Sequence, residues 1–239
     1  MKIILASGSP RRKELLEQAG YTFTVEVSDA DENVEGLAPA AMVEELSLRK
    51  AMAVAQLHMN TEKMESICSD QEKMHSEINQ EKKSPEINQE KKGPEINQEK
   101  KISEIDQEET MKIIGSDTIV VLDEVKLGKP SNEEDAMHML LALSGRNHEV
   151  YTGVTVLTLE EGKLTKKEQF YECTKVKMRK MTVEEIGTYI ATGEPMDKAG
   201  AYGIQGRAAV FISGIEGDYY NVVGLPICHL SMILDQEGM

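Results

Sequence analysis

A short polar repeat in the middle of the chain restricts the folds that this sequence can adopt. From Ser76 the chain reads SEINQEKKS, PEINQEKKG, PEINQEKKI and SEIDQEE, a nine-residue unit used about four times. Solenoid repeats run to roughly 20–50 residues with an apolar face, whereas each unit here offers little more than one isoleucine. Such a unit buries too little apolar surface to offset the entropy lost on ordering. Any packed core must therefore come from the sequence on either side.

We interpret residues 60–110 as a low-complexity, largely disordered insert with transient helix. The insert interrupts a single domain spanning 1–239 in sequence but not in space, because long surface loops add little closure cost. A partner-binding role for the repeats is the alternative.

Composition excludes several classes of protein. The chain carries 27 Lys+Arg against 42 Asp+Glu, a net charge of −15 at pH 7, whereas a general nucleic-acid binder needs a basic surface. Cys68, Cys173 and Cys228 are odd in number and far apart, which suggests neither a disulfide framework nor a zinc site. No run approaches a membrane span, and the apolar part of residues 1–6 is too short for a signal peptide. We expect a soluble protein of the reducing cytoplasm, without nucleic-acid or membrane partners.

Outside the repeats, helix and strand periods alternate, which predicts an α/β protein with mixed strands. Apolar patterns predict strands at 2–6, 112–122, 149–159 and 169–178, a short turn at 123–124, and a hairpin of 208–213 with 219–223. Capping and stop signals predict five helices. The first runs from Pro10 to about Gly20 and the second over 39–59. A third begins at a capping box of Ser131 with Glu134 and ends at about Ser144, a fourth runs from Thr182 to Gly193, and the last follows Pro226.

The turn before the first helix carries more positive charge than a helix N-terminus favours. Residues 7–13 read SGSPRRK, with three cations in the first helical turn. The helix dipole makes each added cation there unfavourable by about 0.3–1 kcal/mol. An anion bound among Ser7, the free amides and the guanidinium groups of Arg11 and Arg12 explains the arrangement. A solvated basic face is the alternative, and for Lys13 it is the preferred interpretation.

Two further charged residues lie in apolar surroundings. Asp117 stands in a strand whose neighbours indicate burial on both faces, where an unpaired carboxylate costs several kcal/mol. We expect it to be a metal ligand, a general base or both, with a core salt bridge as the alternative. Lys50 projects from the apolar stripe of the 39–59 helix. It either faces the same site or extends its amine to the surface.

Two glycine-containing segments also indicate ligand binding. Residues 128–130, GKP, hold a lysine at a strand end, and residues 197–206, DKAGAYGIQG, have the glycine density that lets backbone approach a ligand. Gln205 there can pair with a base edge, and an ordinary glycine-rich loop is the alternative. The chain thus offers cations and an acid for a nucleoside triphosphate with Mg²⁺ or Mn²⁺: Arg11, Arg12, Lys50, Lys129 and Asp117.

In order and spacing, these segments resemble the Maf family of nucleotide pyrophosphatases. The matching motifs are SGSPRR at 7–12, SDTIV at 116–120, GKP at 128–130, DKAGAYGIQG at 197–206 and GDYYNVVGLP at 217–226. The resemblance covers the chain apart from about 60–110. It implies a catalytic domain with a mixed, elongated sheet flanked by helices and two lobes around a cleft, like that of the inosine-triphosphate pyrophosphatases.

The resemblance also implies an activity. Family members hydrolyse the α–β bond of a nucleoside triphosphate to monophosphate and pyrophosphate with a divalent metal. By motif match, Asp117 is the proton acceptor, while Arg12, Thr118 and Gln205 determine substrate specificity. The Tyr-Gly-Ile-Gln-Gly version of the last motif resembles the branch that acts on dTTP and UTP. Family members are commonly homodimers.

On this basis Asp117 activates a water molecule for attack on the α-phosphorus. The expected phosphate-binding residues are Ser7, Arg11, Arg12, Lys50 and Lys129. Asp31 or Glu32 completes the metal shell with Asp117, although an acidic loop of this kind is more often only solvated.

The sequence departs from the family pattern at a few positions and leaves other functions open. Ser116, next to the expected proton acceptor, stands where the family commonly has alanine, and Ala208 where glycine is common. One alternative is a non-catalytic regulator of cell division, after the septum inhibition that gives the family its name. Another is an enzyme of the same fold for purine or methylated GTP. The presence of Asp117 with all four cations favours catalysis.

Overall fold

The computed structural model describes residues 1–34, 36–59 and 110–235. The expected insert at 60–110 lies outside these ranges except for Thr110, so its assignment stays a prediction. The strands are β1 (Lys2–Leu5), β2 (Thr24–Val25), β3 (Met111–Leu122), β4 (Val125–Leu127), β5 (Asn147–Glu160), β6 (Lys163–Met178) and β7 (Ile212–Glu216). The α-helices are α1 (Pro10–Gln18), α2 (Pro39–His58), α4 (Glu133–Leu143), α5 (Val183–Ile190), α6 (Tyr219–Val223) and α7 (Ile227–Leu234). Short 3-10 helices lie at Glu194–Asp197, Ala199–Ala201 and Arg207–Phe211.

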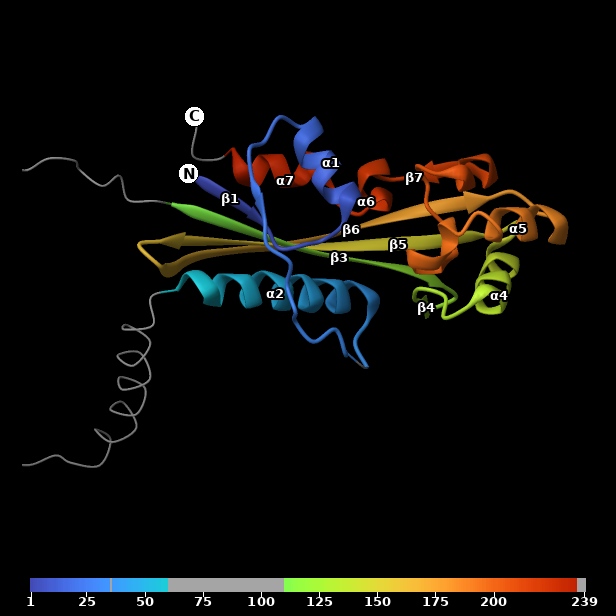
Figure 1. Cartoon of the computed structure of the whole chain (residues 1–239), viewed down its shortest axis with the longest axis horizontal. Helices are drawn as coiled ribbons and strands as arrows, with labels where there is room; N and C mark the ends of the chain where they lie inside the picture. Colours follow the sequence, from blue (N-terminus) through green and yellow to red (C-terminus); the bar gives the residue numbers. More distant parts are fainter. Residues whose placement is uncertain (35, 60–109, 236–239) are drawn as a thin grey trace, which may run out of the picture.

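The described strands form one mixed sheet. Its order is β2-β1-β3-β5-β6-β7, with β4 also paired to β3. β1 runs parallel to β2 and β3, whereas β3, β5, β6 and β7 pair antiparallel in that order. Strands of 12, 14 and 16 residues in β3, β5 and β6 make the sheet long, and Figure 1 shows the resulting elongated shape. The expected mixed, elongated α/β sheet is confirmed.

Helices cover both faces of the sheet. α2 lies on one face, and α1, α6 and α7 lie on the other (Figure 1). On the first face Val54 of α2 packs with Ile113 of β3 and Leu157 of β5. On the second face Leu16 of α1 and Leu230 of α7 join the largest core cluster. β3 is therefore buried on both sides, as its apolar sequence predicts.

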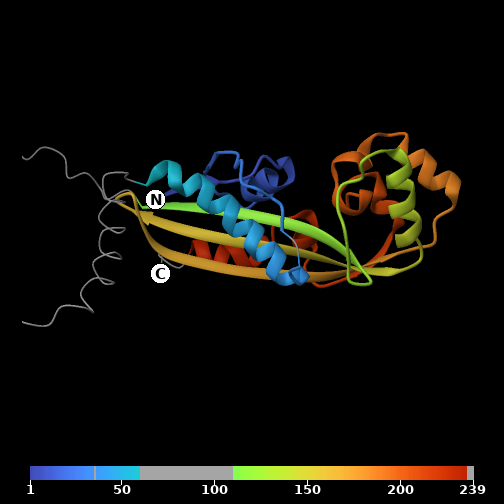
Figure 2. The same cartoon turned by 90° about the horizontal axis from the view of Figure 1, so that it is seen from below.

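A second lobe is built at one end of the long strands. α4, α5, β7 and the 3-10 helices gather there, apart from α1, α2 and α7 (Figure 2). Leu140 of α4, Ile186 of α5 and Phe211 belong to the largest core cluster, which continues into this lobe. The expected arrangement of two lobes is confirmed. None of the described helices is long and apolar enough to cross a membrane.

Two glycines let α2 lie directly against the sheet. A Cβ at Gly115 of β3 would meet the Ser47 carbonyl and lie 2.7 Å from the Ala51 amide nitrogen. A Cβ at Gly153 of β5 would lie 2.8 Å from the Glu44 amide nitrogen. Because real Cβ atoms do not come this close to backbone, any side chain at either position forces α2 outward.

The predicted C-terminal hairpin is wrong. Ala208 lies in a 3-10 helix, β7 pairs with β6, and residues 219–223 form helix α6. The Asp218 carboxylate caps α6 by accepting from the Tyr220 amide at 2.8 Å, and Gly224 ends it with φ of 118°. These two end signals override the β-branched and aromatic residues that suggested a strand.

Two other boundaries also differ from the sequence prediction. The N-cap of α4 is Asn132, which accepts from the Asp135 amide at 2.9 Å, so the capping box of Ser131 with Glu134 is wrong by one residue. β6 begins at Lys163 rather than 169, because the turn residues Glu161 and Gly162, with φ of 51° and 74°, join it tightly to β5.

A buried polar pair attaches the sheet to the second lobe. His148 of β5 is 3% exposed, and its Nε2 lies 2.7 Å from the hydroxyl of Tyr202. Among the described residues, His148 Nδ1 has no hydrogen-bond partner. Burial lowers the pKa of His148 to about 4, so the folded protein holds a neutral imidazole that shares a hydrogen bond with the Tyr202 hydroxyl.

We predict that Gly115→Ala destabilises the protein by about 3 kcal/mol, because the added methyl group displaces α2 from β3. Chemical denaturation measures the free energy of unfolding. Gly214→Ala on β7 is the matched control, since a Cβ there meets nothing within 4 Å, and it should change stability by less than about 1 kcal/mol. Equal stabilities of the two variants would contradict this packing.

We predict that the unfolding free energy falls on acidification from about pH 6.5 to pH 4. Because the pKa of His148 is about 4 in the folded chain and about 6.5 when unfolded, the unfolded chain binds more protons in this window. His148→Gln should remove up to about 3 kcal/mol of that pH dependence. His138→Gln, at an exposed position on α4, should leave it intact. A wild-type pH slope in His148→Gln would refute the prediction.

Candidate active site

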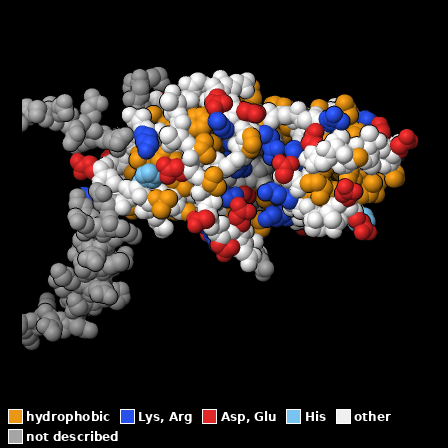
Figure 3. Space-filling model, in the orientation of Figure 1, with side chains coloured by type: hydrophobic (Ala, Val, Ile, Leu, Met, Phe, Trp, Pro, Cys, Tyr) orange, Lys and Arg blue, Asp and Glu red, His pale blue; other side chains and the backbone are white. Residues whose placement is uncertain are grey.

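A cleft of about 840 Å³ opens between the two lobes. Figure 3 shows Lys and Arg side chains gathered over the middle of the molecule, between regions of mixed charge. The structure brings most of the predicted site residues to the lining of this cleft: Ser7, Arg11, Arg12, Glu32, Lys50, Asp117, Thr118, Lys129 and Gln205.

The floor of the cleft is an unpaired stretch on one edge of β3. β5 pairs along the other edge, while β1 pairs with β3 only as far as Ile114 and β4 only from Val120 onward. Residues 115–119 therefore lie in a gap between the end of β1 and β4. Because side chains alternate between faces, Asp117 and Thr118 reach this gap from opposite sides of the sheet.

The ammonium group of Lys50 lies between two carboxylates. Its Nζ is 2.7 Å from Asp117 Oδ1 and 2.7 Å from Glu32 Oε1. The side chains of Lys50 and Asp117 are 14% and 12% exposed, so this contact is shielded from water. Lys50 thus faces the site rather than the surface, and the close packing of α2 on Gly115 holds it there.

Glu32 is the acidic loop residue that reaches Asp117. The hydrogen bond from Lys50 holds the pKa of Glu32 below its ordinary value, and the charges of Lys129 and Lys126 lower it further. Asp31 is exposed and does not line the cleft; its carboxylate accepts from the Asn33 amide at 2.9 Å. The position of Asp31 gives no support to its predicted metal-binding role.

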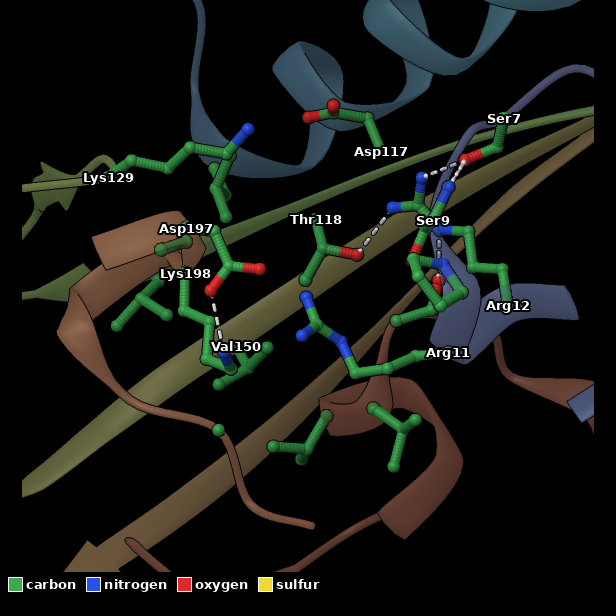
Figure 4. A pocket seen from close by; sticks show the side chains of 18 of the residues that line it. Ser7, Ser9, Arg11, Arg12, Asp117, Thr118, Lys129, Val150, Asp197 and Lys198 are labelled. Atoms are coloured by element: carbon green, nitrogen blue, oxygen red, sulfur yellow. Dashed lines mark hydrogen bonds and ion pairs between the residues drawn. The ribbon is translucent and has the colours of Figure 1, made fainter. Parts of the chain in front are cut away.

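Arg12 joins three segments at the other side of the site (Figure 4). Its Nε donates to the Gly224 carbonyl at 2.7 Å, Nη1 to Ser7 Oγ at 3.0 Å, and Nη2 to Thr118 Oγ1 at 3.1 Å. Burial lowers the pKa of Arg12, and the nearby charge of Asp117 opposes that shift. Arg12 therefore orients Thr118 and Ser7 before any ligand arrives.

The unusual Ser116 supports the same network. Its hydroxyl donates to the Gly224 carbonyl at 3.2 Å, the atom that also accepts from Arg12. This bond lies on the Thr118 face of β3, opposite the Asp117 carboxylate. Ser116 thus anchors the segment after α6 rather than contacting the expected proton acceptor.

The segment that carries Gln205 is held by polar contacts within the second lobe. The Glu194 carboxylate accepts from the Tyr189 hydroxyl at 2.9 Å and from the Arg207 amide at 3.0 Å. A Cβ at Gly206 would lie 2.7 Å from Glu194 Oε2, so a larger residue there requires the Glu194 carboxylate to move. Gln205 itself is exposed and lines the cleft, where its amide is accessible to a ligand.

Sequence reasoning missed four charged residues of the cleft: Lys126, Glu194, Asp197 and Lys198. Lys198 donates to Asp197 at 2.6 Å and to the Glu194 carbonyl at 2.7 Å. Asp197 and Lys198 lay inside a recognised motif but had no assigned role. Glu194 and Lys126 had no local signal, because only the tertiary fold brings them to the cleft.

The site therefore combines a shielded carboxylate, a second carboxylate and a cation-rich wall. Such a wall neutralises phosphate oxygens, and a carboxylate in hydrogen-bond reach of a water molecule acts as a general base. The arrangement can hydrolyse a phosphoanhydride.

Comparison with known proteins gives consistent matches. The profile of a family described as "Maf-like protein" matches residues 2–237. A protein of Agathobacter rectalis named dTTP/UTP pyrophosphatase is 42% identical over 238 residues, covering 100% of this chain and 98% of that protein. Proteins of the same name from Bacillus mycoides and Bacillus cytotoxicus are 41% and 42% identical over 236 residues, each covering 98% of this chain and 95% of the relative.

Full-length identity at this level agrees with the ordered motifs, the mixed sheet and the cleft that the fold builds around Asp117. The chain belongs to the Maf family.

Proposed function

We propose that this chain hydrolyses the α–β bond of dTTP and UTP, and of related modified pyrimidine nucleotides, to a monophosphate and pyrophosphate. The observation that carries the proposal is the placement of Lys50 between Asp117 and Glu32, at 2.7 Å from each, in a cleft rich in cations. The relatives named dTTP/UTP pyrophosphatase support the choice of substrate.

The chemistry is an in-line attack of water on the α-phosphorus. Asp117 accepts the proton of the water as the new bond between oxygen and the α-phosphorus forms. The bond between the α-phosphorus and the bridging oxygen breaks, and its electron pair leaves with pyrophosphate. Arg11, Lys50 and Lys129 offset the charge that develops on this leaving group.

The carboxylates of the site fit a divalent metal. Mg²⁺ prefers hard oxygen ligands, and it commonly binds one or two carboxylates together with substrate phosphates. Among the described residues no three His, Cys, Asp or Glu side chains cluster as a metal site, and the Lys50 ammonium lies between Asp117 and Glu32. These two carboxylates would therefore hold Mg²⁺ or Mn²⁺ only together with a nucleotide whose phosphates bind Lys50. When bound, the metal supplies Lewis acidity at the phosphoryl oxygens.

We expect the base to be recognised on the other face of β3 from Asp117, where Arg12 and Thr118 lie. Thr118 is oriented by Arg12 and by a hydrogen bond with Thr152, whose hydroxyl oxygen lies 2.9 Å away. Gln205 offers both a donor and an acceptor, which matches the paired edge of a pyrimidine. We infer that Arg12, Thr118 and Gln205 together select the pyrimidine.

The substrate pool also suggests where the protein works. Nucleoside triphosphates are cytoplasmic metabolites, and we infer a cytoplasmic enzyme. The homodimer stays a prediction of the family resemblance, and measurement of the molecular mass in solution would test it.

We predict that the purified chain converts dTTP and UTP to dTMP and UMP with pyrophosphate, and that Asp117→Asn lowers kcat by about 10²–10⁴-fold through loss of the general base. Chromatography of the products with a pyrophosphate assay measures both. Asp123→Asn, at an exposed carboxylate just after the same strand, is the matched control and should keep wild-type activity.

Each other product pattern contradicts a defined part of the proposal. Orthophosphate with a nucleoside diphosphate would show cleavage of the wrong bond. Preferential turnover of GTP or methylated GTP would identify a purine enzyme. Nucleotide binding without turnover, equal in wild type and Asp117→Asn, would favour the non-catalytic regulator.

We predict that Lys50→Met abolishes turnover yet raises the affinity of the nucleotide-free protein for Mn²⁺ by about tenfold or more. In the wild type the ammonium occupies the position between the two carboxylates, and its removal leaves two anions that a divalent cation can bridge. Titration calorimetry or the electron paramagnetic resonance of free Mn²⁺ measures the affinity.

Lys129→Met is the matched control for that measurement. It removes a cation from the same cleft, but Lys129 makes no ion pair with Asp117 or Glu32. Equal Mn²⁺ affinities in the two variants would show a general charge effect and contradict the direct competition.

A further inference from the structure

The cations of the cleft differ in whether they have partners. Lys50 is paired with two carboxylates, Lys198 is paired with Asp197, and Arg12 donates to three oxygens. Within the residues that the structure describes, the remaining lining cations form no hydrogen bond or ion pair: Arg11, Lys126 and Lys129. A ligand that carries several negative charges is therefore expected to place them at these three residues.

The position of Lys126 follows from the short strand β4. Its backbone pairs with Val121 of β3, and directly opposed residues of neighbouring strands project to the same face of a sheet. Val121 packs with Val43 and Leu46 of α2. Lys126 therefore projects on the α2 face of the sheet, which is also the face of Asp117 and Lys50.

Lys126 and Lys129 lie near each other and near Glu32. Both contribute to the low pKa of the Glu32 carboxyl, and only Leu127 and Gly128 separate them along the chain. The Gly128 carbonyl between them accepts from the Gly200 amide at 3.0 Å, which ties this segment to the second lobe. Two lysines held on one short segment repel each other unless an anion binds them both.

The two sides of Asp117 differ in chemistry. In Figure 4, Lys129 lies on one side of Asp117, and Ser7 with Arg12 lies on the other. The proposed pyrimidine site is on the side of Arg12 and Thr118. A nucleotide with its α-phosphorus at Asp117 therefore extends its β- and γ-phosphates toward Lys129 and Lys126.

We propose that Lys126 is a further substrate-binding residue, which together with Lys129 binds the β- and γ-phosphates and then the leaving pyrophosphate. This inference rests on the proposed pyrophosphatase function. It adds a residue from outside the recognised motifs, and it gives the direction in which the triphosphate lies.

The test is product inhibition of dTTP hydrolysis in Lys126→Ala. Loss of one charge-assisted contact should raise the KM for dTTP and the inhibition constant of pyrophosphate about tenfold, and the inhibition constant of dTMP should change less than about twofold. Lys126→Arg should restore most of the pyrophosphate binding. Lys163→Ala, which removes an exposed lysine outside the cleft, is the matched control and should behave as wild type.

Two outcomes would overturn the inference. One is unchanged inhibition by pyrophosphate in Lys126→Ala, and the other is an equal loss of inhibition by dTMP, which would place Lys126 at the nucleotide end. Calorimetric titration with inorganic pyrophosphate needs no turnover. If the wild type hydrolyses neither dTTP nor UTP, the proposed function fails, and this titration still shows whether Lys126 binds pyrophosphate.

Discussion

The contact between α2 and the sheet determines where the charged residues of the cleft lie. Gly115 and Gly153 remove the side chains that would separate the helix from β3 and β5. The backbone of α2 thus rests on the sheet, and Lys50 meets Asp117 at 2.7 Å. A buried carboxylate is tolerated only with such a partner. The close packing that Gly115 and Gly153 allow therefore holds the Lys50 ammonium beside the Asp117 carboxylate.

β3 serves both halves of the cleft because its edge is open at residues 115–119. Asp117 faces Lys50 and Glu32 on one side of the sheet, and Thr118 faces Arg12 on the other. One strand thus carries the proposed general base, Asp117, and a proposed specificity residue, Thr118, at adjacent positions. The contact of Lys50 with Asp117 is shielded from water, which makes it stronger than the same contact in water.

Much of this organisation could be predicted from the sequence because its signals are local. The long helix, the buried strands, and the charges of Arg12, Lys50 and Asp117 in unfavourable settings all appear within short windows, and ordered motifs identified the family. The close approach at Gly115 and Gly153 could not be predicted, since it depends on segments far apart in the chain. Lys126 was missed because its direction depends on the register of β4 with β3. The error at α6 arose where the cap at Asp218 competed with a strand-like composition.

The parallel pairing of β1 with β3 has a consequence for synthesis of the chain. Lys2 pairs with Met111, and the apolar side of α2 packs on β3 and β5, so β1 and α2 meet these partners only after β3 and then β5 have been made. Pairing over such sequence distances is slow. During translation the nascent chain carries an uncovered apolar helix face, which favours aggregation. Translation of residues 60–109 prolongs that interval, so the yield of folded protein should depend on elongation rate and on chaperones.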